Sequence, residues 1–129
     1  MDNNSCCLGK LLKVIDTLQK NANNECPMDE GCSRPYLGTF TNSLCYNTRP
    51  VTLYLKNGDL FSAPYNTTGT TSSFFRVERV KDCCARLRVL EPVVNEGVTT
   101  YNATTFLVDV NLKCICAVKC LADIILENI

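Results

Sequence analysis

Cysteine dominates the chemistry available to this chain, since ten of its 129 residues are cysteines. This density is far above ordinary usage. Thiols can bind a metal, carry redox chemistry or form disulfide cross-links, and each use predicts a different function. The candidate residues are Cys6, Cys7, Cys26, Cys32, Cys45, Cys83, Cys84, Cys114, Cys116 and Cys120.

The spacing of the cysteines argues against a metal site and against a redox motif. Structural zinc sites usually contain two Cys-x2-4-Cys pairs, whereas the close pairs here are separated by five, one and three residues. No Cys-x-x-Cys motif of the thioredoxin type is present. We expect no metal and no cofactor, and we keep a small, soluble, disulfide- or zinc-stabilised binding module as the alternative function.

The absence of histidine limits the catalytic chemistry that the chain could perform. Ser-His-Asp and Cys-His catalysis both need an imidazole as general base. The neighbouring carboxylates Asp29 and Glu30 lie in a turn-rich stretch, where solvated surface charge is the usual interpretation, and no glycine-rich phosphate loop is present. The sequence therefore predicts a protein that is not an enzyme.

The charge pattern makes nucleic acid an unexpected partner. Lysine plus arginine and aspartate plus glutamate both number 13, so the net charge is zero, and no basic stripe is present that could neutralise phosphates. A neutral chain lacks the charge repulsion that keeps copies apart, which permits self-association.

Neither end of the sequence predicts contact with a membrane. The apolar run CLADIILENI is too short and too interrupted to span a bilayer, which takes about 20 apolar residues. The stretch MDNNSCCLGK has acids and amides where a signal peptide would have basic residues, so we expect synthesis without a secretion signal.

Adjacent cysteines suggest that the thiols divide their roles. In an extended segment Cys83 and Cys84 would project to opposite faces, so one of them could bond to a neighbouring molecule. Cys114 and Cys116 would share one face of a strand, as would Cys120 if the strand continued. We expect some cysteines to staple the subunit and others to link subunits, and the alternative is five closed bridges within one chain.

An amphipathic helix is predicted over about residues 6–21, with Ser5 or Asn4 as its cap and the asparagines from Asn21 to Asn24 at its end. Its apolar stripe would pack on the sheet or on another subunit. The predicted apolar stripe is Leu8, Leu11, Leu12, Ile15 and Leu18, and the predicted polar face is Lys10, Lys13, Asp16 and Lys20.

The remainder of the chain predicts short antiparallel strands. A cysteine-rich loop over 25–46 precedes a hairpin with a type I′ turn at Asn57-Gly58, and SFFRVERVKDCCARLRVLEP predicts a second hairpin. A polar connection over 95–102 leads to further strands. We expect a mainly β, disulfide-rich single domain over 1–129, with a sandwich- or barrel-like antiparallel sheet region at 50–121 preceded by the helix.

Several motifs resemble the spore coat protein Y/Z family of endospore-forming bacteria, which includes exosporium proteins of the ExsY type. They are SSFFRVERV at 72–80, CARLRVL at 84–90 and VDVNLKCICAVKCL at 108–121, together with ECPMDEGC, PYLG and NTRPVTLY earlier in the chain. The doubled Cys83-Cys84 departs from the single cysteine of the family and leaves the cross-link pattern open.

The resemblance implies a structural protein of the spore surface, in the coat crust or in the basal layer of the exosporium. It implies self-assembly into a two-dimensional lattice of hexameric rings, held by disulfides and in contact with other coat or exosporium proteins. Such proteins are made in the reducing mother cell and meet oxidant after that cell lyses, which agrees with a cysteine-rich chain that needs no secretion signal.

Overall fold

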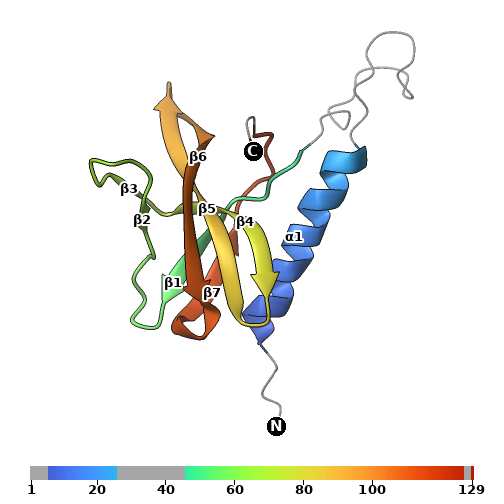
Figure 1. The fold of residues 1–129 in the computed structure, drawn as a ribbon. Coiled ribbons are helices and arrows are strands. Elements are labelled where there is room, and N and C mark those ends of the chain that lie inside the picture. Colours follow the sequence, from blue (N-terminus) through green and yellow to red (C-terminus); the bar gives the residue numbers. More distant parts are fainter. Residues whose placement is uncertain (1–5, 26–45, 127–128) are drawn as a thin grey trace.

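The computed structural model of the protein describes residues 6–25, 46–126 and 129. Within these residues one α-helix precedes seven strands, and Figure 1 shows the helix beside the sheet. The elements are α1 (Cys7–Glu25), β1 (Val51–Leu55), β2 (Ala63–Pro64), β3 (Thr71–Ser72), β4 (Phe74–Lys81), β5 (Cys84–Asn95), β6 (Val98–Asn111), the 3-10 helix η3 (Leu112–Cys114) and β7 (Ile115–Cys120). The predicted cysteine-rich loop over 25–46 falls almost entirely outside the described residues.

Five strands form one antiparallel sheet in the order β6-β5-β4-β1-β7, and β2 pairs with β3 in a separate ribbon. The predicted fold class, mainly antiparallel β with one N-terminal helix, is confirmed. The turn spacing suggested a sandwich- or barrel-like sheet, whereas β6 and β7 are two edges that do not pair with each other. The five-stranded sheet is therefore open.

The predicted hairpin at Asn57-Gly58 forms, but it is short and its turn differs from the prediction. The Leu55 N–H donates to the Asp59 carbonyl at 2.8 Å, and the Phe61 N–H donates to the Leu53 carbonyl at 2.8 Å. Gly58 has a φ of 91°, while Asn57 is not among the residues with positive φ. A type I′ turn needs positive φ at both central residues, so this part of the prediction is wrong.

The β4–β5 hairpin is confirmed, and β5 and β6 form a longer one that the sequence did not predict. Asn95 pairs with Val98 across a two-residue turn, in which Glu96 and Gly97 have φ values of 53° and 80°. Two consecutive positive φ values suit a tight hairpin between twisted strands. The polar connection expected over 95–102 is therefore wrong, because β5 and β6 extend to the turn itself.

Helix α1 is rotated relative to the predicted amphipathic pattern. Leu12 and Ile15 are buried as expected, but Leu11 and Leu18 are exposed. Asp16, which was placed on the polar face, is buried and accepts a hydrogen bond from the Lys20 ammonium at 3.0 Å. The helix also continues through the asparagines to Glu25. The predicted cap residues lie outside the described residues, and the Cys6 carbonyl accepts the first helical bond, from the Lys10 N–H at 3.0 Å.

The buried side chain of Gln19 explains this rotation. Its amide nitrogen donates to the Val77 carbonyl of β4 at 2.8 Å, and its amide oxygen accepts from the Arg49 N–H at 2.9 Å. A buried amide costs free energy unless it is hydrogen-bonded, and here both of its ends are. Gln19 therefore joins α1 to β4 and to the segment before β1, and it turns Leu12 and Ile15 toward the core.

A buried arginine lies on the face of β4 that is opposite to the hydrophobic core. Arg76 is 7% exposed, and it donates to the Thr48 hydroxyl at 2.9 Å and to the Glu78 carboxylate at 2.8 Å. Arg88 of β5 donates to the same carboxylate at 3.0 Å. Both guanidinium groups donate to this one partly buried carboxylate, which compensates one of their two positive charges. In the part of the chain that the structure describes, no helix is long and apolar enough to cross a membrane.

Gly9 sets how closely α1 can approach the turn between β4 and β5. A Cβ atom at this position would overlap the Asp82 carbonyl oxygen and would crowd Cys6. We expect Gly9→Ala to destabilise the fold by about 1–2 kcal/mol, because overpacking costs about 1–3 kcal/mol, a clash with a backbone atom belongs to the upper part of that range, and the helix-propensity gain of alanine offsets at most about 1.

Urea unfolding followed by circular dichroism measures this effect. Lys13→Ala, at an exposed position of the same helix, is the control and should leave stability nearly unchanged. A Gly9→Ala variant as stable as the wild-type protein would show that the close approach is not needed.

Candidate functional site

Five of the described cysteines carry free thiols, and all five are exposed. Cys26, Cys32 and Cys45 lie outside the described residues. Because five of the ten cysteines are free, the alternative of five closed bridges within the chain is wrong. The free thiols are those of Cys7 on α1, Cys84 on β5, Cys114 on η3, and Cys116 and Cys120 on β7.

A disulfide between Cys6 and Cys83 joins the start of α1 to the turn between β4 and β5. The two Cα atoms are 5.6 Å apart, although 77 positions separate the residues in the chain. The Leu112 N–H donates to the Cys83 carbonyl at 2.8 Å, which holds η3 at the same place. Three parts of the chain that are distant in sequence therefore meet at this bridge.

The bridge takes one member of each doubled cysteine and leaves the other exposed. Cys6 and Cys83 bond to each other, while Cys7 and Cys84 are free. The structure therefore separates the roles of Cys83 and Cys84 in the way that their opposite projection suggested. That Cys84 bonds to a neighbouring copy stays a prediction.

Cys84 lines an open, largely basic concavity of about 350 Å³ on the sheet. Lys81 pairs with Cys84, and Arg79 pairs with Arg86, so these side chains share one face. Arg86 donates two hydrogen bonds to the Asp109 carboxylate, at 2.8 and 3.2 Å, and these bonds lower the pKa of that carboxyl. The two ions of this pair offset each other, and the remaining charges of the concavity, those of Arg79 and Lys81, are positive.

The three C-terminal cysteines do not form the predicted one-sided row on a strand. Cys114 ends η3, and β7 begins only at Ile115. The register with β1 shifts by one residue at Cys116, so a bulge interrupts the alternation of faces before Cys120. This part of the prediction is wrong, because η3 turns the chain from one edge of the sheet to the other. All three thiols remain exposed.

Several of the free thiols lie at one end of the molecule. Cys7 follows the bridged Cys6, Cys84 follows the bridged Cys83, and Cys84 pairs with Asn111, which immediately precedes η3. Figure 1 shows the start of α1 and the turn between β4 and β5 at the lower end of the molecule. Within residues 6–25, 46–126 and 129, no three cysteine or carboxylate side chains come together as metal ligands.

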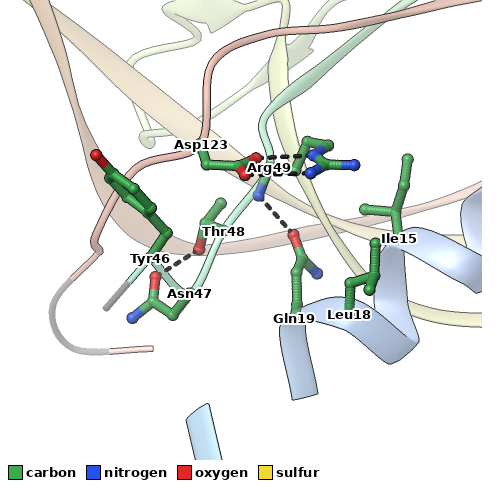
Figure 2. A pocket seen from close by; sticks show the side chains of 8 residues that line it. All are labelled: Ile15, Leu18, Gln19, Tyr46, Asn47, Thr48, Arg49 and Asp123. Atoms are coloured by element: carbon green, nitrogen blue, oxygen red, sulfur yellow. Dashed lines mark hydrogen bonds and ion pairs between the residues drawn. The ribbon is translucent and has the colours of Figure 1, made fainter. Parts of the chain in front are cut away.

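A second, smaller hollow of about 70 Å³ lies between α1 and the segment before β1. Figure 2 shows Gln19 of α1 pointing to the backbone of Arg49, whose side chain meets Asp123. Arg49 donates to the two carboxylate oxygens at 2.7 and 3.1 Å, and these bonds raise the pKa of its guanidinium. Since the polar groups pair with one another, this hollow joins the helix to the C-terminal segment and offers little to a ligand.

Two exposed apolar patches were not predicted from the sequence. One is on α1, where Val14 was not recognised as part of an outward stripe with Leu11 and Leu18. The other is at the end of the β5–β6 hairpin, which the sequence presented as a polar connection. The spacing of the α1 residues was a usable signal, since positions 11, 14 and 18 recur on one side of a helix.

A family model described as "Spore coat protein Z" matches residues 1–106 of the chain. The match includes Cys7, Cys84 and the Cys6–Cys83 bridge, and it ends before the three C-terminal cysteines. No curated protein and no solved structure matched the chain.

We expect Cys6→Ser/Cys83→Ser to lower the free energy of unfolding by roughly 2–4 kcal/mol, because the bridge closes a long loop in the unfolded chain. The neighbouring pair Cys7→Ser/Cys84→Ser is the matched control, and we expect it to stay within about 0.5 kcal/mol of the wild-type protein. Urea unfolding of dispersed protein, with and without reductant, measures both. Reductant should lower the free energy of unfolding of the control variant to that of Cys6→Ser/Cys83→Ser. If reductant does not change the free energy of unfolding of the wild-type protein, the Cys6–Cys83 disulfide is contradicted.

Proposed function

The chain belongs to the spore coat protein Z family, and from this premise we propose that it is a lattice-forming subunit of the outermost spore layer. Family membership gives a structural role in the spore coat, at the spore surface. In the proposed function, copies assemble into hexameric rings that form a two-dimensional sheet, and disulfides between copies then lock it. The layer is the coat crust or the basal layer of the exosporium.

The observation that carries this proposal is the set of five exposed free thiols on four different elements. A single reactive thiol on each copy can produce only a dimer, whereas a sheet needs links to several neighbours. Thiols on α1, β5, η3 and β7 provide links in more than one direction, and the internal Cys6–Cys83 bridge leaves them available.

The zero net charge supports the same proposal, because copies do not repel one another over long distances. The partners proposed are further copies of this chain and other spore coat or exosporium proteins, without nucleic acid or membrane. Synthesis in the reducing mother cell would keep the thiols free until the layer is in place. Oxidation after lysis of that cell would then make the assembly kinetically durable.

Electron microscopy of the purified protein tests self-assembly and locking together. We expect ordered sheets that survive boiling and come apart only when a strong reductant is added, because covalent links then hold the non-covalent contacts together. Wild-type protein that stays dispersed under oxidising and reducing conditions would overturn self-assembly.

A five-serine variant at positions 7, 84, 114, 116 and 120, with Cys6 and Cys83 retained, separates locking from assembly. Its sheets should form as the wild-type sheets do and should dissolve on boiling without reductant. Sheets of this variant that resist boiling would show that the exposed thiols are not the locks.

Peptide mapping under non-reducing conditions tests the role of Cys84. In sheets assembled from a mixture of isotopically light and heavy protein, disulfide-linked peptides containing Cys84 should include mixed-isotope pairs. A Cys84→Ser variant is the control, because its peptide around position 83 should be joined through Cys83 only to a Cys6 peptide of the same isotope. If Cys84 is found only as a free thiol or only in unmixed pairs, it does not link copies.

A further inference from the structure

Two exposed apolar patches suggest how copies recognise each other before disulfides form between them. One patch is bordered by basic side chains and the other by acidic side chains. On α1, the outward side chains of Leu11, Val14 and Leu18 are 42%, 56% and 48% exposed. Isolated exposed apolar residues are ordinary, but three of them at positions 11, 14 and 18 form one continuous stripe along the helix. Cys7 continues this stripe toward the start of the helix.

The border of the α1 stripe is basic. The charged side chains exposed between Cys7 and Asn21 are those of three lysines, Lys10, Lys13 and Lys20. The acid in this range, Asp16, is buried and holds Lys20 at 3.0 Å. A partner for the stripe therefore needs an apolar surface with negative charge beside it. Two copies of the stripe would place lysines against lysines.

The end of the β5–β6 hairpin has these properties. Val93 and Val98 are 36% and 60% exposed on one face of the hairpin there, and Val94 is 70% exposed on the other face. Glu91 lies two positions before Val93 on β5 and so points to the same face, and Glu96 lies in the turn. No lysine or arginine occurs between Arg88 and Lys113, so the whole hairpin beyond Arg88 is acidic.

The two patches cannot meet within one copy. Figure 1 shows the β5–β6 hairpin projecting from the upper end of the sheet, on the side away from α1. A contact between different patches on successive copies is heterologous, and such contacts generate closed rings or open arrays. This is the kind of contact that a ring or sheet requires.

We propose that the β5–β6 hairpin of one copy docks on the outward stripe of α1 of the next copy, with Glu91 and Glu96 beside Lys10 and Lys13. This inference rests on the proposed function and names the contact by which self-assembly begins. It leaves the exposed thiols to act afterwards, since the part of the hairpin beyond Arg88 contains no cysteine.

Charge reversal on each side tests the contact. One variant carries Lys10→Glu and Lys13→Glu, and the other carries Glu91→Lys and Glu96→Lys. In reductant, each variant alone should need at least about tenfold more protein than the wild type to form assemblies, because like charges then face each other. Sedimentation and electron microscopy measure this threshold, and circular dichroism establishes that each variant is folded.

Mixing the two variants gives the sharpest result. Each variant then has the charge that the other lacks, so the mixture should assemble near the wild-type threshold with the two proteins alternating. A variant with all four changes should also recover. Lys56→Glu/Lys119→Glu makes the same charge change as the lysine variant at exposed positions after β1 and on β7, so it is the matched control and should assemble normally.

Assembly of both charge-reversed variants at the wild-type threshold would overturn the docking contact and leave self-assembly standing. A mixture that fails to recover would overturn it as well, and loss of assembly in the hairpin variant alone would indicate another partner surface. Wild-type protein that never assembles would overturn the proposed function and this contact together.

Discussion

The close approach of the first turn of α1 to the turn between β4 and β5 constrains the rest of the structure. Gly9 permits this approach, since any side chain there would meet the Asp82 carbonyl. The disulfide from Cys6 to Cys83 then holds the two turns together covalently. Once the first turn is held, the 3.6-residue period decides which side of α1 faces β4. Gln19 then fixes that side through hydrogen bonds to two separate backbone segments.

The same constraint decides which thiols and which apolar side chains remain at the surface. Because one cysteine of each doubled pair is used in the bridge, Cys7 and Cys84 are left at the surface beside it. Because α1 turns Leu12 and Ile15 inward, a second apolar stripe faces outward instead of the polar surface that a simple amphipathic helix would have. The internal staple thus determines which thiols and which apolar groups are available to other molecules.

The hairpin side of the proposed contact is separate from the thiols that lock the layer, whereas the α1 side begins beside Cys7. The free thiols belong to α1, β5, η3 and β7, several of them near the bridge, whereas the acidic part of the β5–β6 hairpin, beyond Arg88, contains no thiol. Non-covalent contacts are reversible and can correct errors of registration, while disulfides persist once formed. A layer built in a reducing cell and oxidised afterwards would use these two kinds of bond in that order.

The amino-acid sequence by itself determined the mainly β class, the N-terminal helix, the β4–β5 hairpin and the family, because alternation, helical period and motif order are local properties. It could not determine the rotation of α1, since Leu11 fits an inward stripe and Asp16 fits a polar face equally well at that period. Only the tertiary structure decided this, because the two backbone partners of Gln19 come from other segments. The pairing of Cys6 with Cys83 was likewise decided by the fold, which brings together residues that are 77 positions apart.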